Sequence, residues 1–216
     1  MKKFLAGLFG LLIMTSANAS TESVKAFVGG NFSLTDVLWT SYADNEAKAV
    51  GFDLANLNAG LGIMAGARYA TKNTYNIGGT FFYDYILNSK ASLDDKTLAD
   101  ATGWYKWSTG FSMMGVTLDN YIRLFRQNYN EYKRGDLVIG LGTARVTSRH
   151  EIETTAGRVS SDDYSSALVV NLGYNGQMDQ NWDWFIHGRW FYILDNTSEN
   201  EVNSLVNVSV GVKYNF

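Results

Sequence analysis

The chain has 216 residues, a formal net charge of −3, no cysteine and no proline. A mildly acidic chain is a poor nucleic-acid binder, and the absence of cysteine excludes disulfides and thiolate metal sites. Glycine, tyrosine, phenylalanine and tryptophan are plentiful. This composition favours a strand-rich protein, because proline breaks strand ladders and aromatic side chains fit pleated surfaces.

The first 19 residues are expected to be a cleaved signal peptide. The chain starts with the cationic MKK, continues with an apolar run over 4–14, and has the small-x-small sequence ANA at 17–19. The run is shorter than the roughly 20 residues of a membrane-spanning helix. Cleavage before Ser20 leaves one domain, residues 20–216. Its net charge is −5, because the two lysines of MKK are lost and no acid is.

Apolar and polar residues alternate along much of the mature chain, which predicts strands with two unlike faces. The alternating stretches are 25–34, 57–69, 75–85, 168–174, 182–192 and 207–216. Two further strands are predicted over 107–122 and 136–148, although the outward face of the second is ambiguous. The segment RLFRQNYNEYKRGD, residues 123–136, is compatible with a longer strand, a turn or a short helix. A ninth strand there would place the termini on opposite sides of the sheet, which is unusual for a bacterial barrel.

The predicted connections alternate in length. Short turns are expected at 71–74 and 175–181, and long polar loops at 35–56, 88–103 and 149–163, with a shorter loop at 195–201. Short turns on one side and long loops on the other are typical of an outer-membrane barrel whose loops face the outside of the cell.

The last strand presents a choice between two folds. A soluble sandwich would bury Val208, Val210 and Val212, whereas a membrane barrel would turn them to lipid and point Asn207 and Lys213 inward. The positions of the aromatic residues favour the barrel, because they gather at strand ends as interfacial girdles. These are Tyr69, Tyr75, Tyr174, Trp182 and Tyr214 near the short turns, and Tyr83, Tyr85, Trp190 and Tyr192 near the long loops. The predicted fold is all-β: a transmembrane up-and-down antiparallel β-barrel of eight strands.

Three stretches carry a resemblance to known families. The sequences AFVGGNFSL, LVIGLGTA and the terminal VSVGVKYNF resemble those of small outer-membrane β-barrel proteins, including the OmpA-like, OmpX-like and opacity-type surface proteins. The resemblance implies a location in the cell outer membrane and contacts with its lipids and lipopolysaccharide. It also implies insertion by the barrel assembly machinery, with Tyr214 and Phe216 in the terminal signal. These motifs specify a fold and a membrane, and no activity.

Five charged or titratable side chains are predicted to form a polar network inside the barrel. They are Arg68, Asp84, Asp183, His187 and Arg189. The set mixes both charge signs, as expected for groups that neutralise one another away from bulk water, and the lumen of a narrow barrel is expected to be polar and filled.

The sequence predicts no enzymatic activity, cofactor or metal site. His150 lies beside Glu151 and near Ser148, which resembles a hydrolase set, but a solvated loop is the favoured interpretation. The acid pairs at 94–95 and 162–163 lack the spaced oxygens of a calcium loop.

The favoured function is display of the loops at 35–56, 88–103 and 149–163 for adhesion, ligand binding or membrane integrity. A narrow solute channel and a lipid-modifying enzyme are the alternatives. The channel is disfavoured because side chains fill the interior of an eight-strand barrel.

Overall fold

The computed structural model describes residues 23–39, 57–70, 75–92, 104–124, 135–154, 156–194 and 202–216. The expected signal peptide, the segment 125–134 and most of the loops predicted at 35–56 and 88–103 lie outside these ranges. The described strands are β1 (Ser23–Trp39), β2 (Leu57–Ala70), β3 (Tyr75–Ser92), β4 (Trp104–Arg123), β5 (Gly135–Thr154), β6 (Gly157–Gln177), β7 (Trp182–Ile193) and β8 (Val202–Asn215).

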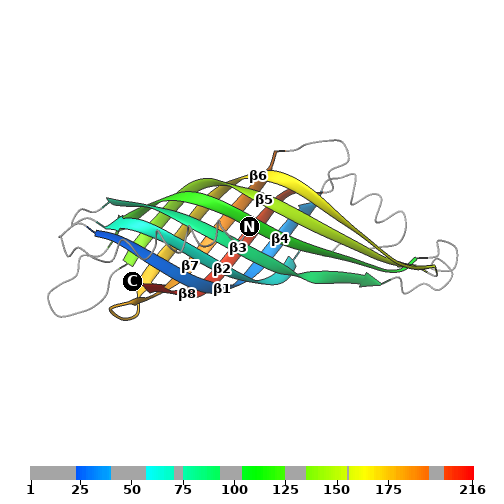
Figure 1. Ribbon diagram of the computed structural model, residues 1–216, viewed down its shortest axis with the longest axis horizontal. Helices are drawn as coiled ribbons and strands as arrows, with labels where there is room; N and C mark the ends of the chain where they lie inside the picture. The colour runs from blue at the N-terminus through cyan, green and yellow to red at the C-terminus, as the bar shows by residue number, and fades with distance from the viewer. Residues whose placement is uncertain are drawn as a thin grey trace, which may run out of the picture.

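The eight strands form one closed barrel in sequence order, and every neighbouring pair is antiparallel (Figure 1). The last strand closes on the first, from Phe27 opposite Asn215 to Trp39 opposite Val202. The prediction of an eight-strand barrel is confirmed. Along the described segments, no helix is long and apolar enough to cross a membrane.

The strand register sets the tilt of the barrel. Following paired residues once around the barrel from Phe27 returns to β1 ten residues further along, at Val37. A shift of this size over eight strands corresponds to the usual tilt of about 35–45° and an interior just wide enough for side chains. Residues on opposite walls of the barrel can therefore touch.

The outer face of the barrel is an apolar band. On β8, Val208, Val210 and Val212 are 48%, 54% and 45% exposed, and comparable leucines, isoleucines and valines cover the other strands. On the other face of β8, Asn207, Ser209 and Lys213 are buried inside the barrel. A sandwich would bury the valines, so the soluble alternative is wrong. A closed barrel with this exterior spans a membrane, because it leaves no backbone group unpaired in lipid.

One predicted loop is wrong. Residues 149–163 belong to a β-hairpin in which β5 and β6 stay paired up to Thr154 opposite Gly157. Its turn contains Gly157 with a φ of +134°, a conformation that favours glycine. Polarity suggested a loop, but Val, Thr, Arg and Tyr side chains pair well across strands outside a membrane as well as inside. We call residues 147–164 the projecting hairpin.

Two neighbouring strands extend with the hairpin. β3 and β4 pair as far as Ser92 opposite Lys106, and β4 pairs with β5 as far as Trp104 opposite Thr154. In Figure 1 these four strands reach well past the rest of the barrel on one side. The start of the loop predicted at 88–103 is accordingly strand to Ser92, and that of the loop predicted at 35–56 is strand to Trp39.

Two exposed valines test which surface faces lipid. Replacing Val208 by Arg should lower the free energy of unfolding by about 2–4 kcal/mol, because a charge then faces the hydrocarbon. Replacing Val159 by Arg should leave the free energy of unfolding unchanged, since this exposed valine lies on the projecting hairpin, outside the lipid. Urea unfolding in lipid vesicles measures both, and equal losses would contradict the assigned faces.

Candidate functional site

The best-connected charged pair of the interior joins opposite walls of the barrel. Arg189 on β7 donates through Nη1 to Asp84 Oδ2 on β3 at 2.6 Å, and Asn31 Nδ2 donates to Asp84 Oδ1 at 3.0 Å. The guanidinium also lies 4.4 Å from the ring centroid of Phe82. Both charged side chains are buried, so the carboxylate is neutralised within the barrel.

A second pair lies near the end of the barrel with the short turns. Arg68 Nη1 donates to Asp136 Oδ2 at 3.1 Å, and Arg123 Nε is 3.9 Å from Asp136 Oδ1. Arg68 also lies 5.9 Å from the ring centroid of Tyr121. Asp136 is the first side chain of β5 inside the barrel, where the sequence indicated only the start of a strand.

The remaining predicted interior residues have other partners. His187 Nε2 donates to Asn175 Oδ1 at 3.0 Å, and Asp183 Oδ2 is 3.9 Å from Lys213 Nζ. The five predicted residues are thus all buried in the interior, but the structure places them in separate clusters rather than in one network. Sequence reasoning pointed Lys213 inward but did not pair it with Asp183, and it missed the partners Asn31, Asp136 and Asn175, because the strand register decides which inward residues meet.

A buried carboxylate was missed altogether. Asp119 on β4 accepts hydrogen bonds from Thr80 Oγ1 at 2.5 Å and Asn171 Nδ2 at 3.0 Å. A Cβ atom on Gly140 would collide with this carboxylate, and one on Gly62 would collide with that of Asp84. The glycines of GLGIMAG and GLGTAR therefore leave room for buried acids, and this was the signal available in the sequence.

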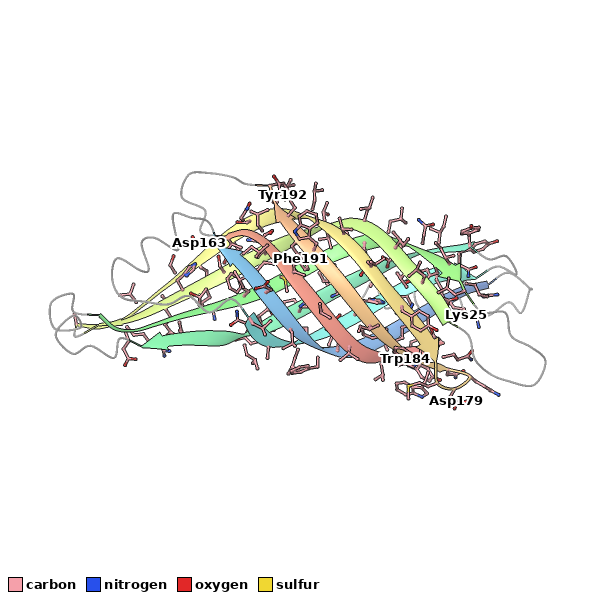
Figure 2. The ribbon with its side chains drawn as sticks, turned by 180° about the vertical axis from the view of Figure 1, so that it is seen from behind. Lys25, Asp163, Asp179, Trp184, Phe191 and Tyr192 are labelled. Atoms are coloured by element: carbon pink, nitrogen blue, oxygen red, sulfur yellow. The ribbon has the colours of Figure 1, made fainter. Side chains whose placement is uncertain are left out.

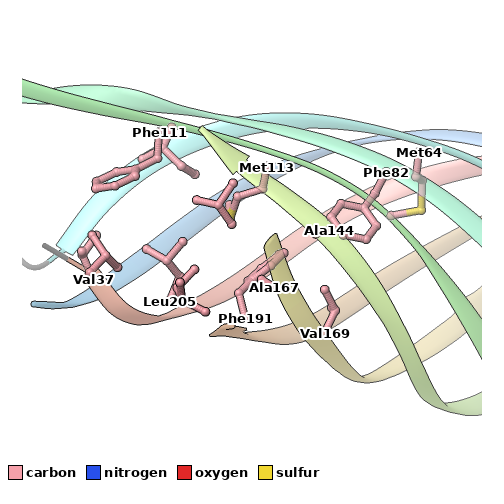
Figure 3. Packing of buried hydrophobic residues seen from close by; sticks show 14 of the residues in the cluster. Val37, Met64, Phe82, Phe111, Met113, Ala144, Ala167, Val169, Phe191 and Leu205 are labelled. Atoms are coloured by element: carbon pink, nitrogen blue, oxygen red, sulfur yellow. The ribbon is translucent and has the colours of Figure 1, made fainter. Parts of the chain in front are cut away.

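The outer end of the interior is apolar, which corrects the expectation of a polar lumen throughout. Figure 3 shows these side chains meeting inside the barrel. The cluster extends along the interior as far as Phe27 and Phe185, and its outer part includes Val37, Ile86, Phe111, Met113, Val146, Ala167, Val169, Phe191, Ile193 and Leu205. We call this outer part the apolar plug. At its inner edge Phe191 packs edge-on against Phe82, with 5.9 Å between ring centroids. The plug lies on the extracellular side of the charged clusters, beside the buried hydrogen bond from Asn207 to Thr35.

The outward aromatic side chains lie in two groups. Trp182 and Tyr214 contact each other at a centroid distance of 5.2 Å near the short turn, and Trp190 and Tyr192 do so at 6.3 Å near the other end. Figure 2 shows Trp184 and Tyr192 at opposite ends of the barrel wall. Tyr69, Tyr75, Tyr83 and Tyr85 are also exposed, and Tyr174 is half-buried against Trp184. Sequence reasoning missed Trp184.

The projecting hairpin carries charged side chains that mostly pair across its two strands. Arg149 binds Asp162 through two hydrogen bonds, Nε to Oδ1 at 2.7 Å and Nη2 to Oδ2 at 3.0 Å. These bonds to the guanidinium lower the pKa of Asp162 and raise that of Arg149. Arg158 also pairs with Glu151 across the strands, through Nε and Oε1.

The structure does not assemble the hydrolase set around His150. Its Nδ1 lies 3.3 Å from Thr109 Oγ1 and its Nε2 lies 3.9 Å from Asp163 Oδ2. Glu151 extends from the opposite face of β5 and is held by Arg158. Among the residues that the structure describes, no group of three or more His, Asp or Glu side chains is arranged to hold a metal ion. The acid pair at 94–95 lies outside those residues.

The barrel is similar to solved structures of outer-membrane proteins. The attachment invasion locus protein Ail of Yersinia pestis matches with a TM-score of 0.51 at 14% identity, over 89% of this chain and 98% of that one. The chain has the fold of a small outer-membrane β-barrel. The predicted fold class and the resemblance to such barrels are thereby confirmed, and a closed barrel with a lipid-facing band belongs in that membrane.

Two further similar structures have lower TM-scores. Neisserial surface protein A scores 0.42 at 15% identity, over 91% of this chain and all of that one. The N-terminal barrel domain of Pseudomonas aeruginosa OprF scores 0.41 at 9% identity, over 88% and 97%. No protein-family model and no curated protein matches the sequence.

The buried ion pair gives a stability prediction. Replacing Arg189 by Met should lower the free energy of unfolding by about 3–5 kcal/mol, because Asp84 is left buried without its cation. Replacing Asp84 by Leu in the same protein should restore much of the loss.

The exposed pair of the hairpin is the matched control. Arg149→Met should leave the unfolding free energy unchanged, since both partners lie in water. Urea titrations of the three variants measure these differences. A loss for Arg189→Met no larger than that for Arg149→Met would contradict a structural role of the interior pair.

Proposed function

We propose that the protein is a non-enzymatic outer-membrane surface protein whose barrel is a rigid support for an extracellular binding element, with a role in adhesion or membrane integrity. The observation that carries the proposal is the continuation of ordered strands beyond the outer aromatic group. β5 and β6 remain paired for the whole projecting hairpin. An ordered hairpin presents side chains at little entropic cost on binding.

The surface of the hairpin fits this role. Tyr164 and Val159 are 57% and 63% exposed, although both are large apolar side chains that lie outside the lipid band. Aromatic side chains held on a rigid element are frequent anchors in protein interfaces. The cross-strand pairs Arg149–Asp162 and Arg158–Glu151 stiffen the strands that carry them. The loops predicted at 35–56 and 88–103 remain further proposed contacts for a ligand.

The filled interior argues against the channel alternative. The apolar plug occupies the outer end, and three buried acid–base pairs occupy the middle and the end with the short turns. An ion would have to cross the side chains of the apolar plug and then displace a salt bridge, and both steps are costly.

The end of β8 supports a role for Tyr214 and Phe216 in assembly. Phe216 is 62% exposed, packs against Tyr214 at a centroid distance of 5.1 Å, and donates its backbone N–H to Ala26 O at 3.0 Å. Both rings face outward at the end of β8, the strand that closes the barrel on β1. The barrel assembly machinery could therefore bind them before the barrel closes.

Shortening the hairpin tests the proposed function. Replacing residues 147–164 by a two-residue turn should remove binding to host cells or to an immobilised surface ligand and leave the barrel folded. Folding is checked by the difference in gel migration between unboiled and boiled samples. A matched control replaces residues 178–181, the turn at the opposite end, and should leave binding intact. Unchanged binding by the shortened protein would refute the role of the hairpin.

Conductance tests the interior. The purified protein in planar bilayers should show no steady ion current, because the apolar plug and the charged clusters fill the lumen. Stable single-channel steps that respond to Phe191→Ala would favour the channel alternative instead.

A further inference from the structure

One arginine lies at the boundary between the apolar band and the projecting hairpin. The outward-facing residues of β5 run Ile139, Leu141, Thr143 and then Arg145, all of them exposed. On the neighbouring strand β6 the apolar series ends at Leu168, one outward position before Ser166, which is opposite Arg145. Arg145 is thus the first charged group that follows the lipid-facing residues of this wall.

The strand register places Arg145 beside the outer aromatic group. Arg145 is opposite Met114 on β4, and Met114 is opposite Tyr83 on β3. On its other side Arg145 is opposite Ser166, and the adjacent outward residue of β6, Leu168, is opposite Tyr192 on β7. Tyr83 belongs to the outer aromatic residues, whose rings occupy the headgroup level of a membrane. The guanidinium therefore lies where the phosphates of the outer lipid leaflet are found.

Arg145 is held in place without being neutralised. Its guanidinium carbon lies 4.1 Å above the ring centroid of Tyr164. No acidic side chain of the described residues pairs with it, whereas the next outward arginine of the strand, Arg149, is bound by both oxygens of Asp162. Stacking fixes the plane of the guanidinium and leaves its N–H groups available for a bidentate anion.

We propose that Arg145, oriented by Tyr164, binds a phosphate group of an outer-leaflet glycolipid on the β4–β6 wall of the barrel. A planar guanidinium at headgroup depth matches the geometry and charge of a lipid phosphate. The opposite side of the barrel carries an acid on its outward face, Asp36 on β1, between the exposed Leu34 and Leu38. The proposed site lies on the β4–β6 wall. It uses Tyr164, the last residue of the projecting hairpin, but it does not depend on what the hairpin binds.

The test uses bisphosphorylated lipid A as the probe. The purified protein in zwitterionic detergent is titrated with lipid A, and native mass spectrometry gives the apparent dissociation constant. Arg145→Gln should weaken binding roughly fivefold to tenfold, the effect of one surface cation. Arg149→Gln should bind lipid A like the natural protein, because its charge is already matched by Asp162. Dephosphorylated lipid A should bind the natural protein as weakly as lipid A binds Arg145→Gln.

Further variants keep the test decisive. Arg145→Lys is the substitute if Arg145→Gln does not fold, as judged by heat-dependent gel migration. Arg145→Lys should fold and show an intermediate affinity, because lysine keeps the positive charge but lacks the paired N–H donors of the guanidinium. Tyr164→Ala should also weaken lipid A binding, because the guanidinium loses its support. Equal affinities for the natural protein and Arg145→Gln, or an equal loss in Arg149→Gln, would overturn the proposal. Inorganic phosphate that binds Arg145 as tightly as lipid A would overturn the lipid assignment.

Discussion

The structure depends on the requirement that every backbone N–H and C=O group be hydrogen-bonded where no water is present. The pairing of β8 with β1 meets this requirement, because it removes the two edges that an open sheet of the same strands would expose to lipid. Closure also fixes the two faces of each strand. Apolar side chains such as Val210 must then face lipid, and their neighbours, such as Ser209, must fit a narrow interior.

The narrow interior in turn decides how charge is accommodated. A register shift of ten residues over eight strands leaves no space for a water column, so a buried acid has to meet a cation or several donors. Asp84 meets Arg189 and Asn31, and Asp119 meets Thr80 and Asn171. The space for both acids comes from glycines on the adjacent strands. The apolar plug then seals these clusters from the extracellular side, so the barrel is rigid and closed.

Outside the lipid, water can form hydrogen bonds with exposed backbone groups, so strand pairing is no longer required for that reason. The projecting hairpin is stabilised by cross-strand pairs in water, each of which contributes little alone. Such a surface tolerates changes of side chain without loss of the fold, which suits a binding element. At the boundary between the two regimes lies Arg145, where a charge is stable only if the membrane itself supplies an anion or water.

The sequence by itself determined the eight strands, their lipid-facing side and the membrane. Apolar residues at every second position indicate strands with one apolar face, and aromatic residues at the ends of those faces are typical of a membrane barrel and not of a soluble sandwich. The pattern from Val208 to Phe216 shows this in one strand. Only the tertiary structure decided that Asp84 pairs with Arg189, 105 residues away, since the register shift determines which residues of opposite walls share a level. It also decided that the outer lumen is apolar and that residues 149–163 form strands. Inward positions can be filled by any side chain that packs, and polarity alone does not distinguish a solvated hairpin from a loop.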